Sequence, residues 1–268
     1  MTIYVVSHKE YEFSKSDDYA VIQVGNIFNA EYLNDSVGEN IANKNKNYCE
    51  LTALYWLWKN SQDDYLGLVH YRRYFCGIEQ GLSIKGNYIV TETELKKSAH
   101  EGIVVPKKQQ LDMSVYQHWA HCHHLRDWLG IGRLIRANYS EYLDAYYEVS
   151  ESYELHLYNM FYMKKNILDE YCAWLFELLS EYENFIDLND YSDYQARFFG
   201  FASERLFNIW LKKNKYILYE FDVVALEDTS LTELHDQALI ASIKYKFVKC
   251  LKELISFFKY RAFKIGLF

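Results

Sequence analysis

The chain has 268 residues, of which 50% are hydrophobic and 18% aromatic, with one proline and 11 glycines. A chain of this length and composition can bury a full core in one large domain, which excludes a disordered protein. The formal net charge of −8 disfavours a nucleic-acid binder, because such proteins present basic surfaces. No apolar run approaches the roughly 20 residues of a transmembrane helix. Five scattered cysteines without a CxxC motif indicate a reducing cytoplasm.

The first half of the chain predicts alternating strands and helices. Apolar runs at Ile3–His8 and Tyr19–Gly25 are typical of buried strands. In Asn40–Asn60, apolar residues recur at three- and four-residue steps, which predicts one amphipathic helix. The run Tyr65–Val69 then predicts a strand that leads directly into the cationic stretch "HYRRYF".

The second half continues this alternation. Its predicted elements are a strand at Gly102–Lys108, a helix at Met113–Ala137, a strand at Leu155–Lys165, a helix at Ile167–Phe185, a helix at Ala196–Asn214 that a break near Gly200 could divide, and a strand at Tyr216–Leu226. Strands that alternate with helices indicate an α/β fold. Ligands of such open sheets bind beyond the carboxyl ends of the strands, where Ser7, His8, Gly25, Asn26 and the "HYRRYF" stretch are expected.

The arginines of this stretch have two interpretations. Arg72 and Arg73 could pair with acidic side chains at the surface. Alternatively, they bind a phosphate or diphosphate, because a guanidinium presents a planar fork that matches phosphate oxygens.

Several separated motifs carry a resemblance to a known family. "HYRRYF", preceded by "KNKNYCELTALYWLWKN" and followed by "YNMFYMKK" and "FGFASERL", resembles a family of bacterial capsule and lipopolysaccharide glycosyltransferases, long described only as a domain of unknown function. The resemblance extends from about Ile3 to Val224. It implies a GT-A-like fold that binds a nucleotide sugar, and some relatives are linked to galactofuranose transfer.

The resemblance also suggests what the cationic stretch does. Most GT-A enzymes hold a divalent metal with an Asp-x-Asp motif, which this chain lacks. We therefore expect no metal and no cofactor, and we expect Arg72, Arg73 and His70 to stabilise the leaving diphosphate instead. Alternation along an extended segment would put Arg72 on the side of His70 and Arg73 on the opposite side. Arg72 is then the better catalytic candidate, beside His70, and Arg73 a donor-binding or structural residue.

A transfer that inverts the anomeric centre needs a base for the acceptor hydroxyl. By resemblance, Glu204 is the candidate, because inverting GT-A enzymes commonly place an acid at a helix start in this region. Two structural alternatives remain, a solvated pair with Arg205 or a capping interaction with Ser203. Asp190 and Asp193, just upstream, are the other acids considered.

Further polar residues are expected to bind the donor. Asn40, Lys44 and Asn45 fall on neighbouring positions of the predicted helix, where they could also form a solvated face. His8 follows the first strand. Asn159 lies in an apolar predicted strand, and its buried amide needs partners, either backbone groups or a sugar hydroxyl.

The histidine cluster "HWAHCHH" predicts either structural or acceptor-groove roles, or a metal site. On one continuous helix, His118, His121 and His124 would share a face at three-residue steps, and zinc accepts such ligands. Against zinc, the ligands would drift around the helix and no HExxH motif accompanies them.

The C-terminal segment differs in charge from the rest of the chain. From Ile240 to Phe268 it carries seven Lys or Arg and one acid, Glu253, with apolar residues at helical spacing. A cationic amphipathic helix suits the surface of an anionic bilayer. The alternative is a helix that packs on the body or in a homodimer.

Together these patterns predict a GT-A-like domain over residues 1–230, a mixed sheet flanked by helices, and a basic amphipathic helical tail over residues 231–268. We expect a metal-independent glycosyltransferase that moves galactofuranose or galactose from a nucleotide-diphosphate donor, UDP-linked, to a lipid-linked oligosaccharide or surface polysaccharide. It would be cytoplasmic and associated with the inner face of the plasma membrane, with no nucleic-acid partner. The alternatives are a non-catalytic carbohydrate- or partner-binding scaffold, suggested by the many aromatic residues, and a metal hydrolase built on the histidines.

Overall fold

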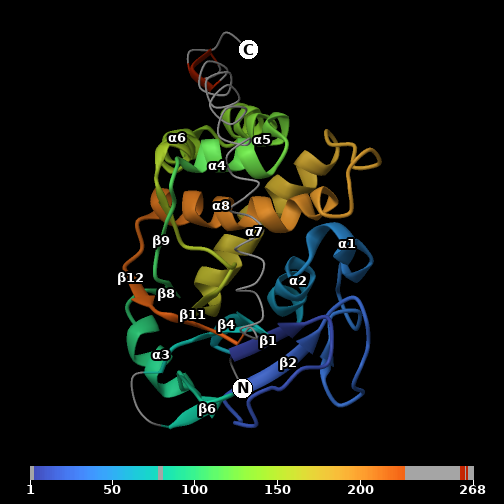
Figure 1. Cartoon of the computed structure of the whole chain (residues 1–268), viewed down its shortest axis with the longest axis vertical. Coiled ribbons are helices and arrows are strands. Elements are labelled where there is room, and N and C mark those ends of the chain that lie inside the picture. The colour runs from blue at the N-terminus through green and yellow to red at the C-terminus, as the bar shows by residue number, and fades with distance from the viewer. Residues whose placement is uncertain (1–2, 78–80, 227–259, 263, 265–268) are drawn as a thin grey trace, which may run out of the picture.

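The computed structural model describes residues 3–77, 81–226, 260–262 and 264. Within these residues, a mixed sheet forms one layer and most of the helices form a thick second layer above it (Figure 1). The strands follow the order β12-β8-β11-β4-β1-β2-β3, and β5 joins β4 to β13. Their bounds are β1 Ile3–Ser7, β2 Tyr19–Gln23, β3 Leu33–Asn34, β4 Tyr65–His70, β5 Arg73–Phe75, β8 Ile103–Pro106, β11 Phe161–Lys164, β12 Leu218–Phe221 and β13 Val223–Ala225. The predicted α/β architecture is confirmed.

The strands that position the site run parallel. β1 pairs in parallel with β2 on one side and with β4 on the other, so the carboxyl ends of all three meet at one edge of the sheet. Strand alternation sends Tyr4 and Val6 of β1 into the core beneath the helices, and Ile3 and Val5 into a second core on the opposite face.

The helices cover mainly one face of the sheet. They are α1 Asn45–Tyr48, α2 Leu51–Asn60, α3 Glu92–Ala99, α4 Val115–Cys122, α5 Leu125–Asn138, α6 Leu143–Glu151, α7 Lys165–Glu183 and α8 Phe198–Asn214, with 3-10 turns at Ala42–Lys44, Ser140–Tyr142 and Gln195–Arg197. Two small antiparallel pairs, β6 Leu82–Ile84 with β7 Asn87–Ile89 and β9 Gln109–Gln110 with β10 Glu154–Leu155, complete the described elements. Figure 1 shows α3 and β6 away from the main helical layer.

Two predicted helices are interrupted. The helix expected over Asn40–Asn60 breaks at Cys49, whose φ of 52° is left-handed, and α8 passes so close that a Cβ on Gly200 would lie 3.3 Å from the Cys49 side chain. The helix expected over Met113–Ala137 ends at Cys122, because His123 and His124 are extended. Conversely, α8 continues through Gly200 without a break.

Two predicted strands are shorter than expected. Only Phe161–Lys164 of the stretch Leu155–Lys165 joins the main sheet, because Tyr158 and Asn159 form a left-handed turn before it. The stretch Tyr216–Leu226 divides into β12 and β13, which pair with different strands.

The predicted tail, residues 231–268, lies outside the described residues except for Tyr260–Ala262 and Lys264. Tyr260 is buried, with its ring centroid 4.2 Å from that of Tyr116 on α4. Lys264 pairs with Glu151 of α6 at 2.8 Å. This short part of the tail therefore packs on the helical layer. No helix in the described ranges combines the length and the apolar character that a membrane span requires.

Candidate active site

A cleft of about 440 Å³ opens at the carboxyl ends of β1 and β4. Its floor comes from the strand ends, and its sides come from the α1–α2 junction, the turn before β11 and the first half of α8. The lining residues are Val6, Ser7, His8, Val24, Asn45, Lys46, Cys49, Glu50, His70, Tyr71, Arg72, Arg73, Tyr158, Arg197, Gly200, Phe201 and Glu204. The cleft lies where the strand pattern predicts a ligand, and it gathers His8, Asn45, His70, Arg72, Arg73 and Glu204 from the expected site residues.

A tight hairpin carries the "HYRRYF" stretch. β4 ends at His70, the chain turns at Tyr71 and Arg72, and β5 begins at Arg73, which pairs with His70 in antiparallel register. Directly paired residues share a face of the sheet. The expectation that Arg73 opposes His70 is therefore wrong, because the segment is a hairpin and not one extended strand. Both arginines line the cleft.

The aromatic rings of the cleft support its cations. The Arg72 guanidinium lies 5.1 Å from the ring centroid of Tyr71, and that of Arg73 lies 4.7 Å from the ring centroid of Tyr158. The imidazole of His8 packs edge-on against Tyr71 at 5.2 Å. Burial in the cleft, together with the nearby cations of Lys9, Arg72 and Arg197, lowers the pKa of His8. The cationic surrounding therefore favours the neutral form of His8.

Arg197 and Lys46 also line the cleft, and together with Arg72 and Arg73 they form its cationic wall. Neither residue was among the expected site residues. Arg197 ends the 3-10 turn before α8, and its Nε donates to the Sγ atom of Cys49 over 3.3 Å. Burial and the negative charge of Glu50 raise the pKa of the Cys49 thiol, whereas Arg197 opposes that rise. The signal that could have identified Arg197 is its position at a helix start, two residues before Phe199, where the "FGFASERL" motif begins.

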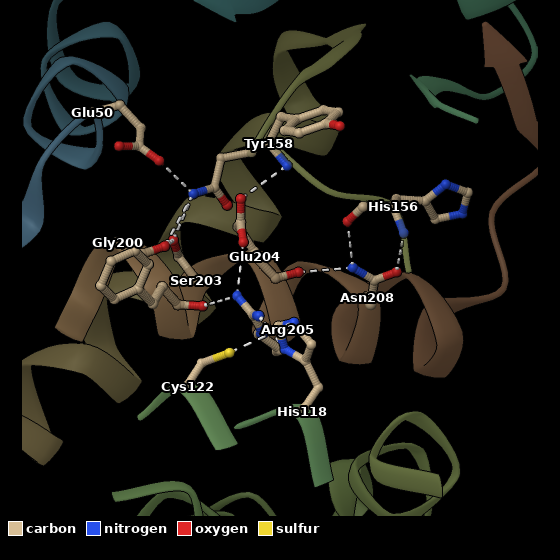
Figure 2. Close-up of polar contacts among 12 residues, drawn as sticks. Glu50, His118, Cys122, His156, Tyr158, Gly200, Ser203, Glu204, Arg205 and Asn208 are labelled. Carbon is tan, nitrogen blue, oxygen red and sulfur yellow. Dashed lines mark hydrogen bonds and ion pairs between the residues drawn. The ribbon is translucent and has the colours of Figure 1, made fainter. Parts of the chain in front are cut away.

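Glu204 presents the carboxylate on the α8 side of the cleft. Its Oε1 accepts from the backbone N–H of Tyr158 over 3.0 Å, and its Oε2 accepts from Arg205 over 2.7 Å (Figure 2). Burial is the main reason that its pKa is raised; Arg205 opposes the rise, Glu50 adds to it, and the Tyr158 N–H and His70 lower it again. Glu204 lies in the middle of α8 and not at its start, and Ser203 does not cap the helix, since its hydroxyl donates to the Gly200 carbonyl over 2.8 Å.

The turn before β11 lies between the two carboxylates of the described lining, Glu50 and Glu204. Asn159 has a φ of 50°, and its buried side-chain amide donates to Glu50 over 2.7 Å and to Ser203 over 2.9 Å. His70 donates through Nε2 to the carbonyl of Tyr158. Asn159 therefore lies behind the cleft wall, in a turn and not in the apolar strand that its neighbours predict.

The motif "KNKNYCELTALYWLWKN" and Asn40 just before it lie only partly in the cleft. Asn45 lines the cleft, and its side-chain amide donates to the Cys49 carbonyl over 2.9 Å. The same side chain lies so close to Gly25 that a Cβ at that glycine would be 2.8 Å from the Asn45 Oδ1 atom. Asn40 instead holds a surface turn by donating to the Gly38 carbonyl over 2.7 Å. Lys44 pairs with Glu183 of α7 at 2.6 Å. Asn40 and Lys44 thus lie outside the cleft.

Comparison with known proteins places the chain in a family. Residues 2–215 match the family described as "Domain of unknown function (DUF4422)". The chain belongs to this family. No curated protein matches it. Among solved structures, it is similar to the apo structure of the bifunctional glycosyltransferase WbbM, with 28% identity, a TM-score of 0.75, and coverage of 85% of this chain and 45% of WbbM.

This similarity has two consequences for the DUF4422 chain. Its mixed sheet flanked by helices matches the fold of a glycosyltransferase, as the sequence motifs led us to expect. The chain also spans less than half of the WbbM chain, which is bifunctional.

The side chains of the histidine cluster do not share one face of a helix, because α4 ends at Cys122. His118 lies beside Cys122 and Arg205, whereas His123 contacts Gln195, and the ring of His124 packs on Tyr191. Across the described part of this family member, no group of three or more His, Cys, Asp or Glu side chains is arranged to hold a metal ion. Cys49, Cys76, Cys122 and Cys172 are free thiols.

Proposed function

We propose that the protein is a glycosyltransferase that moves a hexose, galactofuranose or galactose, from a UDP-linked donor to a lipid-linked oligosaccharide or surface polysaccharide. The observation that carries the proposal is one cleft that combines a cationic wall with carboxylates, at the carboxyl edge of a glycosyltransferase-like sheet. The similarity to a bifunctional glycosyltransferase supports the same class of reaction.

The cationic wall suits a diphosphate leaving group. Arg72, Arg73 and Arg197 converge on the cleft from the hairpin and from the start of α8. When the bond from the anomeric carbon to the diphosphate oxygen breaks, its electron pair goes to that oxygen, and fixed guanidinium forks stabilise the charge. Since the sequence has no Asp-x-Asp motif, we assign this stabilisation to the arginines and propose that no metal is required.

The base is proposed to be Glu204. The acceptor hydroxyl oxygen forms the new bond to the anomeric carbon, and its proton passes to the carboxylate. Contacts with Tyr158 and Arg205 fix the orientation of that carboxylate, and its side chain keeps 20% exposure toward the cleft. His70, bound to the Tyr158 carbonyl, holds the same turn from the strand side. We propose that His8 and Asn45 contact the donor.

Thermal shift with UDP, GDP and CMP tests donor binding, because a ligand that binds only the native state raises the melting temperature. We expect UDP to give the largest shift and Arg197→Ala to reduce it. Absence of a shift with all three nucleotides would overturn the donor site. Binding of sugars without any UDP release from UDP-galactofuranose or UDP-galactose would instead support the scaffold alternative.

We also propose a location at the inner face of the plasma membrane. The support is the sequence from Ile240 to Phe268 within this tail, which carries seven Lys or Arg and one acid, with apolar residues at helical spacing. Because acceptors built on a lipid carrier are confined to the bilayer, an enzyme held at its surface would meet them efficiently.

A further inference from the structure

An aromatic surface adjoins the cleft. It is formed by Phe201 of α8, Tyr194 of the preceding loop and His123 of the α4–α5 junction. The ring centroids of Tyr194 and Phe201 are 5.0 Å apart, and those of His123 and Phe201 are 4.5 Å apart. The rings of His123 and Tyr194 are nearly parallel, at 12° and 6.1 Å. We call these three side chains the aromatic platform.

We propose that the aromatic platform binds a neutral sugar ring of the acceptor glycan. The identification of that sugar as the acceptor rests on the proposed glycosyltransferase function. The platform also gives a role to His123, one residue of the histidine motif.

The aromatic platform is continuous with the groups proposed to react. Phe201 lines the cleft and lies three residues before Glu204 on the same helix. Residues at this spacing share a helix face. A sugar that stacks on Phe201 therefore has its hydroxyls next to the carboxylate proposed as the base. Tyr194, with 54% of its surface exposed, extends the aromatic surface outward from that point.

The loop that carries Tyr194 is held in place by side-chain contacts. The side chain of Gln195 donates to the Cys122 carbonyl over 2.8 Å and contacts Nδ1 of His123 at 3.1 Å. Asn47 of α1 donates to the Ala196 carbonyl over 2.8 Å. Because these contacts already order the loop, a ligand would not have to supply that ordering free energy.

The chemistry of the platform suits a neutral sugar. Burial is the main reason that the pKa of His123 is lowered to about 4; the Gln195 contact opposes the shift, and the nearby Arg205, His118 and His124 add to it. At neutral pH the platform is therefore uncharged and aromatic. Aromatic faces carry partial negative charge, which attracts the C–H face of a sugar ring. At the rim, Lys46 and Asp193 form a solvent-exposed pair at 3.3 Å that can exchange hydrogen bonds with sugar hydroxyls.

Saturation-transfer NMR on the full chain tests the platform with methyl β-D-galactopyranoside, methyl β-D-glucopyranoside and methyl α-D-mannopyranoside. We expect the wild-type protein to saturate the ring C–H protons of at least one glycoside. Tyr194→Ala should raise the dissociation constant of that glycoside by about threefold to tenfold, since one aromatic contact is lost. Tyr194→Phe, which keeps the ring, should bind as the wild type does.

The matched control is Tyr153→Ala, which removes an equally exposed tyrosine, at 52%, that lies away from the cleft. It should leave glycoside binding unchanged. Equal binding by wild type and Tyr194→Ala, or absence of saturation transfer from wild type to all three glycosides, would overturn the platform. The UDP thermal shift is measured on the same proteins. If that shift is absent while Tyr194-dependent glycoside binding persists, the donor proposal fails and the platform stands as a sugar site.

Discussion

The side-chain amide of Asn159 donates a hydrogen bond to the Glu50 carboxylate over 2.7 Å, which ties the turn before β11 to the α1–α2 junction. Its neighbour Tyr158 holds Glu204 through the backbone N–H, over 3.0 Å. Both turn residues are left-handed, with φ of 78° and 50°. The turn at Tyr158 and Asn159 therefore orients carboxylates on two sides of the cleft. The positions of both carboxylates depend on the left-handed backbone of this turn as well as on side-chain contacts.

Replacement of Asn159 separates the side-chain and backbone parts of this arrangement. Asn159→Ala removes the donor to Glu50 and Ser203 and forces alanine into a left-handed conformation, so we expect a loss of about 2–4 kcal/mol in the free energy of unfolding. Asn159→Gly removes the same donor but tolerates the backbone, and should be about 1 kcal/mol more stable than the alanine variant. Urea unfolding measures both. Equal stability of the two variants would mean that the turn is not strained.

Removal of Arg72 tests the diphosphate clamp. We expect Arg72→Ala to lower turnover by roughly 100-fold, the scale for loss of one group that stabilises transition-state charge. Arg72→Lys should fall between the alanine variant and wild type, because it keeps the charge but loses the planar fork. Arg133→Ala, on the exposed face of α5, is the matched control and should leave turnover unchanged. Steady-state kinetics that show full activity for Arg72→Ala would remove the clamp role.

The raised pKa of Glu204 predicts a pH dependence of the reaction. A base must be ionised, so kcat/KM should increase with pH, with its acidic limb above the ordinary glutamate value of 4.5. The stability of the fold should depend on pH in the opposite direction. Because the Glu204 carboxyl binds its proton more tightly in the folded state, the free energy of unfolding should decrease as pH rises from 4.5 through the folded pKa.

Glu204→Gln checks the assignment of that limb. It should retain the UDP thermal shift but lose most of the transfer activity and the acidic limb of the rate profile. If the limb survives in the glutamine variant, another group titrates, and Asp190 or Asp193 becomes the candidate base.

Chelation tests the metal expectation directly. Because we assign charge stabilisation to Arg72, Arg73 and Arg197, transfer should persist in excess EDTA and should not increase with added Mg²⁺ or Mn²⁺. The measurement is donor turnover before and after dialysis against chelator. Loss of activity that Mn²⁺ restores would show that carboxylates such as Glu50 and Glu204 act through a metal instead.

The sequence predicted the sheet and the edge that carries the cleft, because strand alternation and the charged end of β4 are local signals. For the same reason, together with the resemblance of the motifs, the sequence predicted four residues that line the cleft, namely His70, Arg72, Arg73 and Glu204. Breaks at Cys49 and at His123 were not predictable in the same way. Cys49 is left-handed where α8 passes closely, and this contact joins residues about 150 positions apart.

The place of Arg197 and the orientation of Glu50, a polar residue of the "KNKNYCELTALYWLWKN" motif, illustrate the same limit. Arg197 reaches the cleft only because the 3-10 turn before α8 packs beside Cys49. Glu50 is positioned by an amide 109 residues away. Neither position carries a periodic signal, since side chains that meet through tertiary contacts leave no fixed spacing along the chain.

The last prediction concerns the membrane role of residues 231–268. Truncation is a poor test, because Tyr260 is buried against Tyr116 and its removal would uncover the helical layer. We therefore expect a clearer result from the full chain with Lys244, Lys246, Lys249 and Lys252 changed to Gln. Wild type should sediment with vesicles that contain phosphatidylserine at low salt and dissociate at high salt, since each cation near such a surface contributes about 1 kcal/mol. The variant should remain in the supernatant while its melting temperature and UDP shift stay unchanged. Phosphatidylcholine vesicles are the control for apolar insertion without charge. Equal sedimentation of wild type and variant with the anionic vesicles would contradict an electrostatic anchor and favour packing of the whole segment on the body or in a homodimer.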